Sequence, residues 1–84
     1  APDDVAAIAA CVRARAEVRS VHDLKTRAGR IPHVDFHVVV DPELTTRAVH
    51  DLYLALRADI RARVGASTKV LMHADPEPPA TAER

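Results

Sequence analysis

The sequence predicts an α+β domain in which two helices lie on one face of a three-stranded sheet, in the order αββαβ. Apolar residues recur at helical spacing around residues 3–15 and 46–64, as in amphipathic helices. Three other segments are rich in aliphatic residues, and the segment 31–40 alternates as a strand with one buried face does. Gly29 separates the first two of these segments, which favours a hairpin.

The first helix is expected from about Asp3 to Arg15. Asp3 and Asp4 follow Pro2, and carboxylates in a first turn cap free N–H groups and complement the helix dipole. The apolar positions expected on its buried side are Val5, Ile8, Val12 and Ala16.

The next two strands are expected at residues 18–27 and 31–40, joined by the turn 28–30. Gly29 can adopt the positive φ that such a turn requires. Pro42 cannot continue an interior ladder, so the second strand is expected to end before it. One face of this strand is predicted to carry Val34, Phe36, Val38 and Val40, and the other Asp35, His37 and Val39.

The second helix is expected to begin with Thr45 or Thr46 as its cap and to end at Gly65, a residue typical of helix C-termini. Its predicted buried stripe contains Val49, Leu52, Leu56, Ile60 and Val64. The last strand is expected at residues 69–74. It places Val70 and Met72 on one face, and Leu71, His73 and Asp75 on the other.

Length and composition limit the range of functions. The 84 residues suffice for one small domain, which we expect at residues 1–76, followed by a proline-rich disordered tail at residues 77–84. The formal net charge is zero, which argues against nucleic acid as a partner because phosphate binding needs a basic surplus. Cys11 is the single cysteine, so no internal disulfide is expected and a reducing compartment fits. No apolar run approaches the length of a membrane span, and no signal peptide is expected at the N-terminus.

Two helices on one sheet face leave the other face uncovered. Val39 and Leu71 are predicted to lie on that face, so part of it is apolar. A partly apolar uncovered face favours association, most simply with a second copy of the chain. The sequence therefore predicts a homodimer.

Five histidines suggest a metal site, although the chain contains no local zinc motif such as H-x-x-H or C-x-x-C. His37 lies centrally in its strand, His73 and Asp75 are two residues apart and point the same way, and His22 lies in the first strand. His50 lies at the edge of the second helix's apolar stripe. Neutral imidazole suits zinc and similar cations, and a carboxylate can bridge two ions. A single histidine on a strand is more often an ordinary surface residue, and His33 keeps that interpretation.

Three segments resemble the cytosolic C-terminal domain of cation diffusion facilitator (cation efflux) transporters. They are residues 21–27 (VHDLKTR), 34–38 (VDFHV) and 70–76 (VLMHADP). The resemblance covers residues 3–76 and implies a metallochaperone-like, ferredoxin-like αββαβ sandwich that dimerises in the cytosol below a membrane domain. It also implies a two-metal site near the dimer interface, whose ligand positions match His22, His37, His50, His73 and Asp75.

The implied function is regulatory and not enzymatic. The domain would bind Zn²⁺, or Fe²⁺, Mn²⁺, Co²⁺, Ni²⁺ or Cd²⁺, and stabilise a closed, transport-competent dimer of a transporter in the cell inner membrane. The transmembrane domain is not part of this chain. Three alternatives remain open at this point: a free-standing soluble metal buffer or chaperone, an enzyme that uses histidine and aspartate, and a dimerisation module in which the histidines are incidental.

Overall fold

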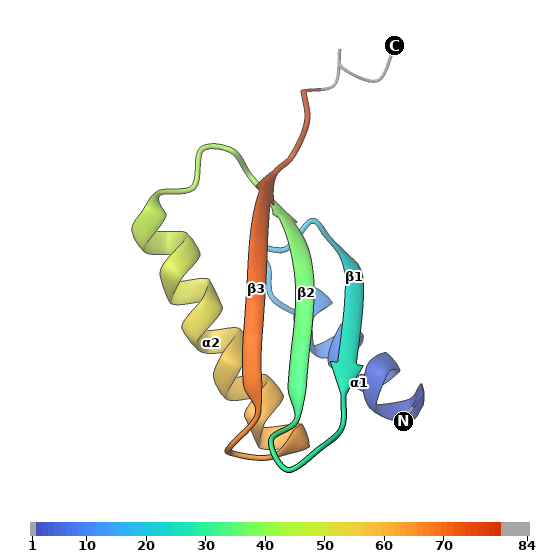
Figure 1. Ribbon diagram of the computed structural model, residues 1–84. Helices are drawn as coiled ribbons and strands as arrows, with labels where there is room; N and C mark the ends of the chain where they lie inside the picture. Colours follow the sequence, from blue (N-terminus) through green and yellow to red (C-terminus); the bar gives the residue numbers. More distant parts are fainter. Residues whose placement is uncertain (1, 80–84) are drawn as a thin grey trace.

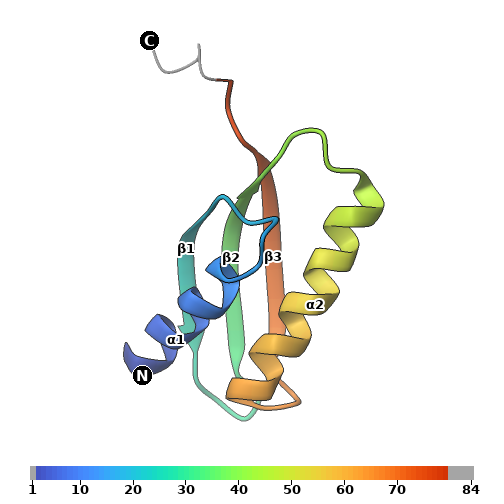
Figure 2. The ribbon, with the colours of Figure 1, turned by 180° about the vertical axis from the view of Figure 1, so that it is seen from behind.

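The computed structural model describes residues 2–79 and has the predicted element order, with two helices on one face of a three-stranded sheet. Its elements are α1 (Pro2–Arg13), β1 (Ser20–Arg27), β2 (His33–Val40), α2 (Thr46–Val64) and β3 (Lys69–Pro76). The sheet order is β1-β2-β3; β1 and β2 are antiparallel, whereas β2 and β3 are parallel. Figure 1 shows the uncovered face of the sheet, and Figure 2 shows α1 and α2 in front of the other face.

The core lies between β2 and the two helices. Alternate residues of β2 face inward and are almost fully buried, as the sequence predicts. The other buried side chains come mainly from the apolar stripes of α1 and α2, because helical periodicity brings them to the sheet. The buried apolar residues are Ile8, Val12, Val34, Phe36, Val38, Val40, Leu52, Leu56, Ile60 and Val70.

Both predicted caps of α2 are present. Thr45 is the N-cap, and its hydroxyl accepts a hydrogen bond of 3.0 Å from the Ala48 N–H. Gly65 follows the helix with a φ of +145°, and its N–H donates to the Arg61 carbonyl at 2.9 Å. These contacts fix where α2 begins and ends. Helix α2 is the connection that returns the chain to the sheet, where β3 lies parallel to β2.

Helix α1 ends at Arg13, two residues before the predicted end. The chain turns there, and the Arg15 guanidinium donates two hydrogen bonds, of 2.7 and 2.9 Å, to Asp59 Oδ2 on α2. Its position beside the Asp59 carboxylate raises the pKa of Arg15, which stays charged. The contact holds the end of α1 against α2.

Strand β3 continues to Pro76, beyond the predicted end at Ala74. Pro76 is opposite Val40 in the parallel ladder. A proline is tolerated there because β3 is an edge strand, so its missing N–H can be on the side without a neighbour. Residues 77–79 have no regular structure, and the rest of the predicted tail, residues 80–84, lies outside the described residues. Neither described helix is long and apolar enough to cross a membrane.

Strand β1 contains an irregularity that the sequence analysis did not anticipate. His22 pairs with His37, but the next pair is Lys25 with Asp35, so β1 has one more residue than β2 in this interval. Asp23 has a φ of +54°, in the left-handed region. Such a bulge turns Leu24 towards the core while His22 and Lys25 stay on the outer face.

Replacing Asp23 with valine should therefore destabilise the domain. The left-handed conformation costs roughly 1–2 kcal/mol for an ordinary side chain, and asparagine tolerates it best after glycine. Asp23→Val should lower the melting temperature by roughly 4–8 °C for each kcal/mol of stability lost. The melting temperature of Asp23→Asn should stay near that of the unsubstituted chain. Thermal denaturation at one protein concentration with a chelator tests this, and equal melting temperatures for the two variants would contradict it.

Candidate metal centre

Three of the five histidines form a row across the uncovered face of the sheet. His37, at the centre of β2, is directly opposite His22 of β1 and His73 of β3. Opposite residues on one face have Cβ atoms about 4.5–5.5 Å apart. Because the bulge at Asp23 comes after His22, it leaves this pairing intact. The sheet register therefore brings together side chains that are far apart in the sequence.

His37 is closest to its neighbours in β3. Its ring centroid is 4.7 Å from that of His73, and its Nδ1 is 3.3 Å from Asp75 Oδ2. The side chains of His37 and Asp75 are 39% and 55% exposed, so a solvent ion can reach them. When Nδ1 carries the proton it donates to Asp75, and Nε2 keeps a free lone pair. This arrangement is typical of metal-binding histidines held by a carboxylate.

A polar contact outside the ligand set holds the end of β3 that carries Asp75. Arg19 Nε is 3.4 Å from Glu77 Oε1, and an Arg19 terminal nitrogen is 3.9 Å from Asp41. The Glu77 N–H donates to the Val40 carbonyl at 2.7 Å. Sequence reasoning missed these residues, because only the strand order shows that they meet at one end of the sheet.

The row is not assembled into a complete site within one chain. His22 Nε2 is 3.0 Å from Ser20 Oγ and is turned towards that hydroxyl. Among the described residues, no three histidine, cysteine or acidic side chains converge closely enough to hold an ion as they stand. Ion binding here requires side-chain rotations, which cost little on an exposed face. The spacing of Ser20 and His22, two residues apart on one strand, was a sequence signal for this contact.

His50 lies apart from the other four predicted ligands. It is exposed in the second turn of α2, in the layer behind the sheet, whereas His37 and His73 are on the uncovered face. Its ring centroid is 6.4 Å from that of Tyr53, whose hydroxyl donates to the Val70 carbonyl at 3.1 Å. The structure therefore brings four of the five predicted residues to one face and leaves His50 beside the β3 edge.

His33 lies on the same face of β2 as His37 but in a different electrostatic environment. Its register partners are Arg27 and Lys69, whereas those of His37 are two histidines. Neighbouring cations disfavour the binding of a divalent ion by charge repulsion. The ordinary surface interpretation of His33 is consistent with this position.

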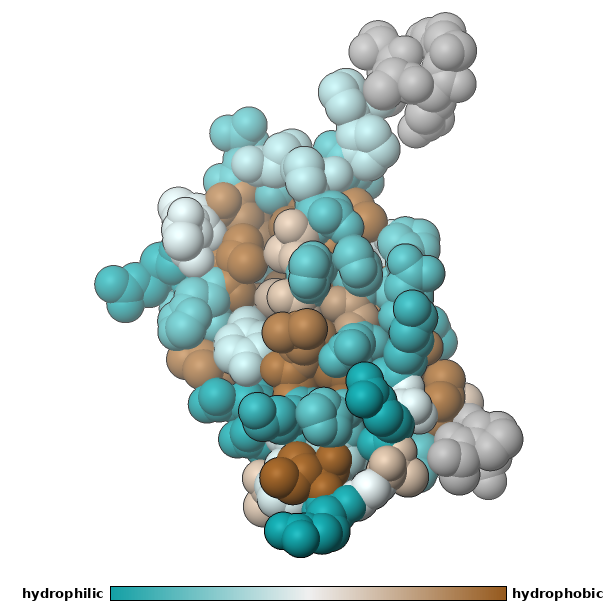
Figure 3. Space-filling view, in the orientation of Figure 1, coloured by the Kyte–Doolittle hydropathy of each residue, from teal (hydrophilic) through white to brown (hydrophobic). Residues whose placement is uncertain are grey.

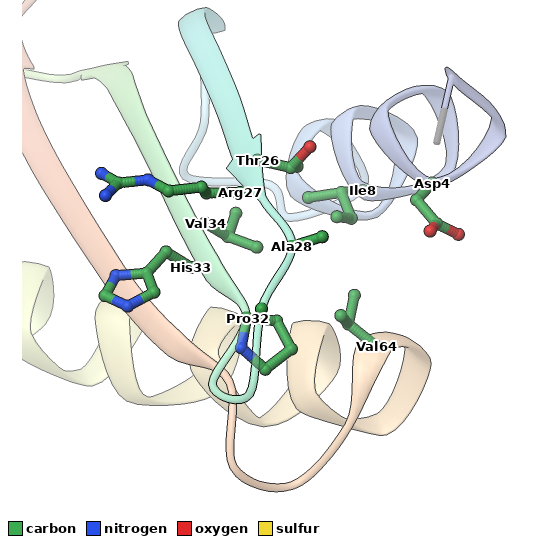
Figure 4. A pocket seen from close by; sticks show the side chains of 10 residues that line it. Asp4, Ile8, Thr26, Arg27, Ala28, Pro32, His33, Val34 and Val64 are labelled. Atoms are coloured by element: carbon green, nitrogen blue, oxygen red, sulfur yellow. The ribbon is translucent and has the colours of Figure 1, made fainter.

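Two hollows differ in their suitability for an ion. A depression of about 150 Å³ on the uncovered face includes Asp35, His37 and His73 in its lining. Figure 3 shows this face, where hydrophobic surface runs between hydrophilic side chains. A second hollow of about 180 Å³ lies under the β1–β2 hairpin, where Ile8, Pro32 and Val64 meet (Figure 4). Its lining is mainly aliphatic and has two metal-binding groups, Asp4 and His33, whereas the first hollow has four, including His37 and His73.

The comparison with protein families agrees with this fold. Residues 1–77 match the family model described as the cytoplasmic domain of cation efflux proteins. The chain belongs to this family. It is thus a cytoplasmic dimerisation domain of a cation efflux transporter of the cation diffusion facilitator type. The family resemblance that residues 21–27, 34–38 and 70–76 indicated is confirmed.

Solved structures of MamM domains have the same fold. A nickel form of one MamM CTD variant superposes with a TM-score of 0.80 at 22% identity, over 93% of this chain and 100% of that chain. A nickel form of another variant gives 0.80 at 20% identity, over 93% and 100% of the two chains. A third variant gives 0.79 at 22% identity, over 90% and 96%. No curated protein matches the chain.

Proposed function

We propose that this domain binds divalent cations through the row of histidines and thereby draws two cytoplasmic domains together. The observation that supports this most directly is the register of the sheet, which lines up His22, His37 and His73 and adds Asp75 at a hydrogen-bond distance from His37. All four lie on the uncovered face, so rotations of exposed side chains can direct their donor atoms at one point.

The donor set suits zinc-like cations. Three neutral imidazoles and one carboxylate supply the nitrogen and oxygen ligands of tetrahedral zinc, and Fe²⁺, Mn²⁺, Co²⁺, Ni²⁺ and Cd²⁺ accept the same donors. Asp75 has two oxygens, so Oδ2 can keep its contact with His37 while Oδ1 binds an ion or bridges two ions. The nickel forms of the MamM CTD variants support a divalent cation as the ligand here.

The position of His50 favours a site shared between two copies. Within one chain His50 lies in the layer behind the sheet, so it does not face the row. If His50 is a ligand, a second copy can supply it more easily than the same chain. The site then links the subunits, and the cation binds the closed dimer more tightly than the open one.

In the transporter, this coupling would act as a population shift. A cation stabilises the closed pair of domains only to the extent that it binds the closed state more tightly than the open state. We propose that residues 1–76 form this regulatory unit, attached to a transmembrane domain in the cell inner membrane, and that the closed pair favours the transport-competent state. The protein family supports this assignment over the enzymatic alternative.

Zinc titration should show up to two ions per protomer, because five ligands exceed the four of one tetrahedral ion. His37→Ala should abolish most of this binding, since His37 is the centre of the row. His33→Ala is the matched control: it removes the same side chain from the same face, beside Arg27 and Lys69. Isothermal calorimetry at neutral pH measures both variants, and equal losses would show that the row is not the site.

Zinc should also make the dimer more compact, and acid should reverse the change. An imidazole must be neutral to bind a metal ion, and the reference pKa of histidine is about 6.5, so protons compete with zinc as the pH falls from roughly 6.5 to 5. His50→Ala should keep part of the zinc binding but lose the compaction. Small-angle scattering with zinc at neutral pH, with zinc in acid, and with chelator tests this. Identical curves in the three conditions, with zinc binding confirmed, would refute the closing mechanism.

A further inference from the structure

The charges of this neutral chain are unevenly distributed between the two ends of the sheet. The end formed by the β1–β2 hairpin, the C-terminus of α2 and the start of β3 is rich in cations. These cations are Arg27, Arg30, Arg61, Arg63 and Lys69. The carboxylates described at this end are Asp4 in the first turn of α1 and Asp35, which is the register partner of Lys25. The opposite end carries Asp41, Asp75 and Glu77, and Arg19 there pairs with Asp41 and Glu77.

The same end presents an apolar side chain. Ile31 lies between Arg30 and Pro32 in the hairpin and is 47% exposed. The hairpin is held in place, because the Lys69 N–H donates to the Pro32 carbonyl at 2.9 Å and Arg61 Nε donates to the Thr68 carbonyl at 2.9 Å. An exposed aliphatic residue beside several cations is a combination that suits the interface of an anionic membrane.

The first described residues lie at this end too. Helix α1 begins beside the hairpin, where Asp4 borders the same hollow as Ala28 and Pro32 (Figures 1 and 4). If the proposed transmembrane domain is attached through the segment before α1, this end faces the bilayer. The attachment then raises the local concentration of the domain at the membrane surface.

We propose that this cationic end, with Ile31 at its tip, binds the anionic phospholipid surface next to the transmembrane domain. Phosphate headgroups bind the arginine and lysine side chains, and Ile31 enters the boundary between headgroups and acyl chains. The contact fixes the orientation of the domain under the membrane. It involves none of the proposed metal ligands, so it does not depend on cation binding, although its role in the transporter rests on the proposed attachment.

Vesicle sedimentation of the 84-residue chain, with a chelator present, tests the proposal. The chain should bind phosphatidylcholine vesicles that contain about one-third phosphatidylglycerol, should not bind pure phosphatidylcholine, and should dissociate at high salt. Each cation near an anionic surface contributes about 1 kcal/mol, or about fivefold in affinity. The triple variant Arg30→Gln/Ile31→Ser/Lys69→Gln should therefore bind at least about 25-fold more weakly.

The matched control is Arg13→Gln/Arg47→Gln/Leu54→Ser, which removes two exposed cations and one exposed aliphatic side chain away from this end. It should bind as the parent does, and circular dichroism should show that both variants are folded. Equal losses in the two variants, or equal binding to neutral vesicles, would overturn the proposal. Binding to an acidic peptide without binding to anionic vesicles would assign this end to a protein partner and would also overturn it. Because the assay contains no free metal, its failure leaves the proposed cation site standing.

Discussion

The alternation of β2 is the constraint on which the rest of the structure depends. Val34, Phe36, Val38 and Val40 are at most 4% exposed, and they form the surface on which both helices pack. Complete burial of such a side chain stabilises the fold by about 1.5–3 kcal/mol. A shift of the strand by one residue would expose all four, so the register is firmly set. The same constraint fixes the opposite face, where His37 must point away from the core.

Much of the fold could be predicted because its signals are local. Thr45 and Gly65 mark the ends of α2 through hydrogen bonds within one turn, and the alternation of β2 is visible in eight consecutive residues. The features that were missed depend on contacts distant in sequence. Arg15 leaves the helical path towards Asp59, 44 residues away. The bulge at Asp23 had only one weak signal, the spacing of three between the inward-facing Val21 and Leu24, where a regular strand has two.

The candidate site was predictable to a similar extent. The pairing of His73 with Asp75 on one face follows from their spacing, and the exposure of His37 follows from the alternation of β2. The row itself required the registers of two strand pairs, one antiparallel and one parallel, which the sequence does not determine. The resemblance to cation efflux domains pointed to the same residues without showing how the strands align. The helical periodicity placed His50 at the edge of the α2 stripe correctly. The predicted layers already put α2 on the face opposite His37, so they separate His50 from the row within one chain.

The uncovered face carries the proposed cation site around His37 and cationic side chains at its hairpin end. The distance between these two regions decides whether the cations weaken the site. His33 and His37 are four residues apart on β2, which corresponds to about 13 Å at the rise of a strand. Charges on exposed side chains are screened over about 8 Å at physiological ionic strength. The field of Arg27 and Lys69 is therefore weak at His37 but strong at His33, their register partner. The cation nearer to His37 is Lys25, which lines the same hollow as His37 and is the register partner of the Asp35 carboxylate. One strand can thus carry His37, a proposed cation ligand, and His33, which lies between two cations, so the two ends of the face can serve separate partners.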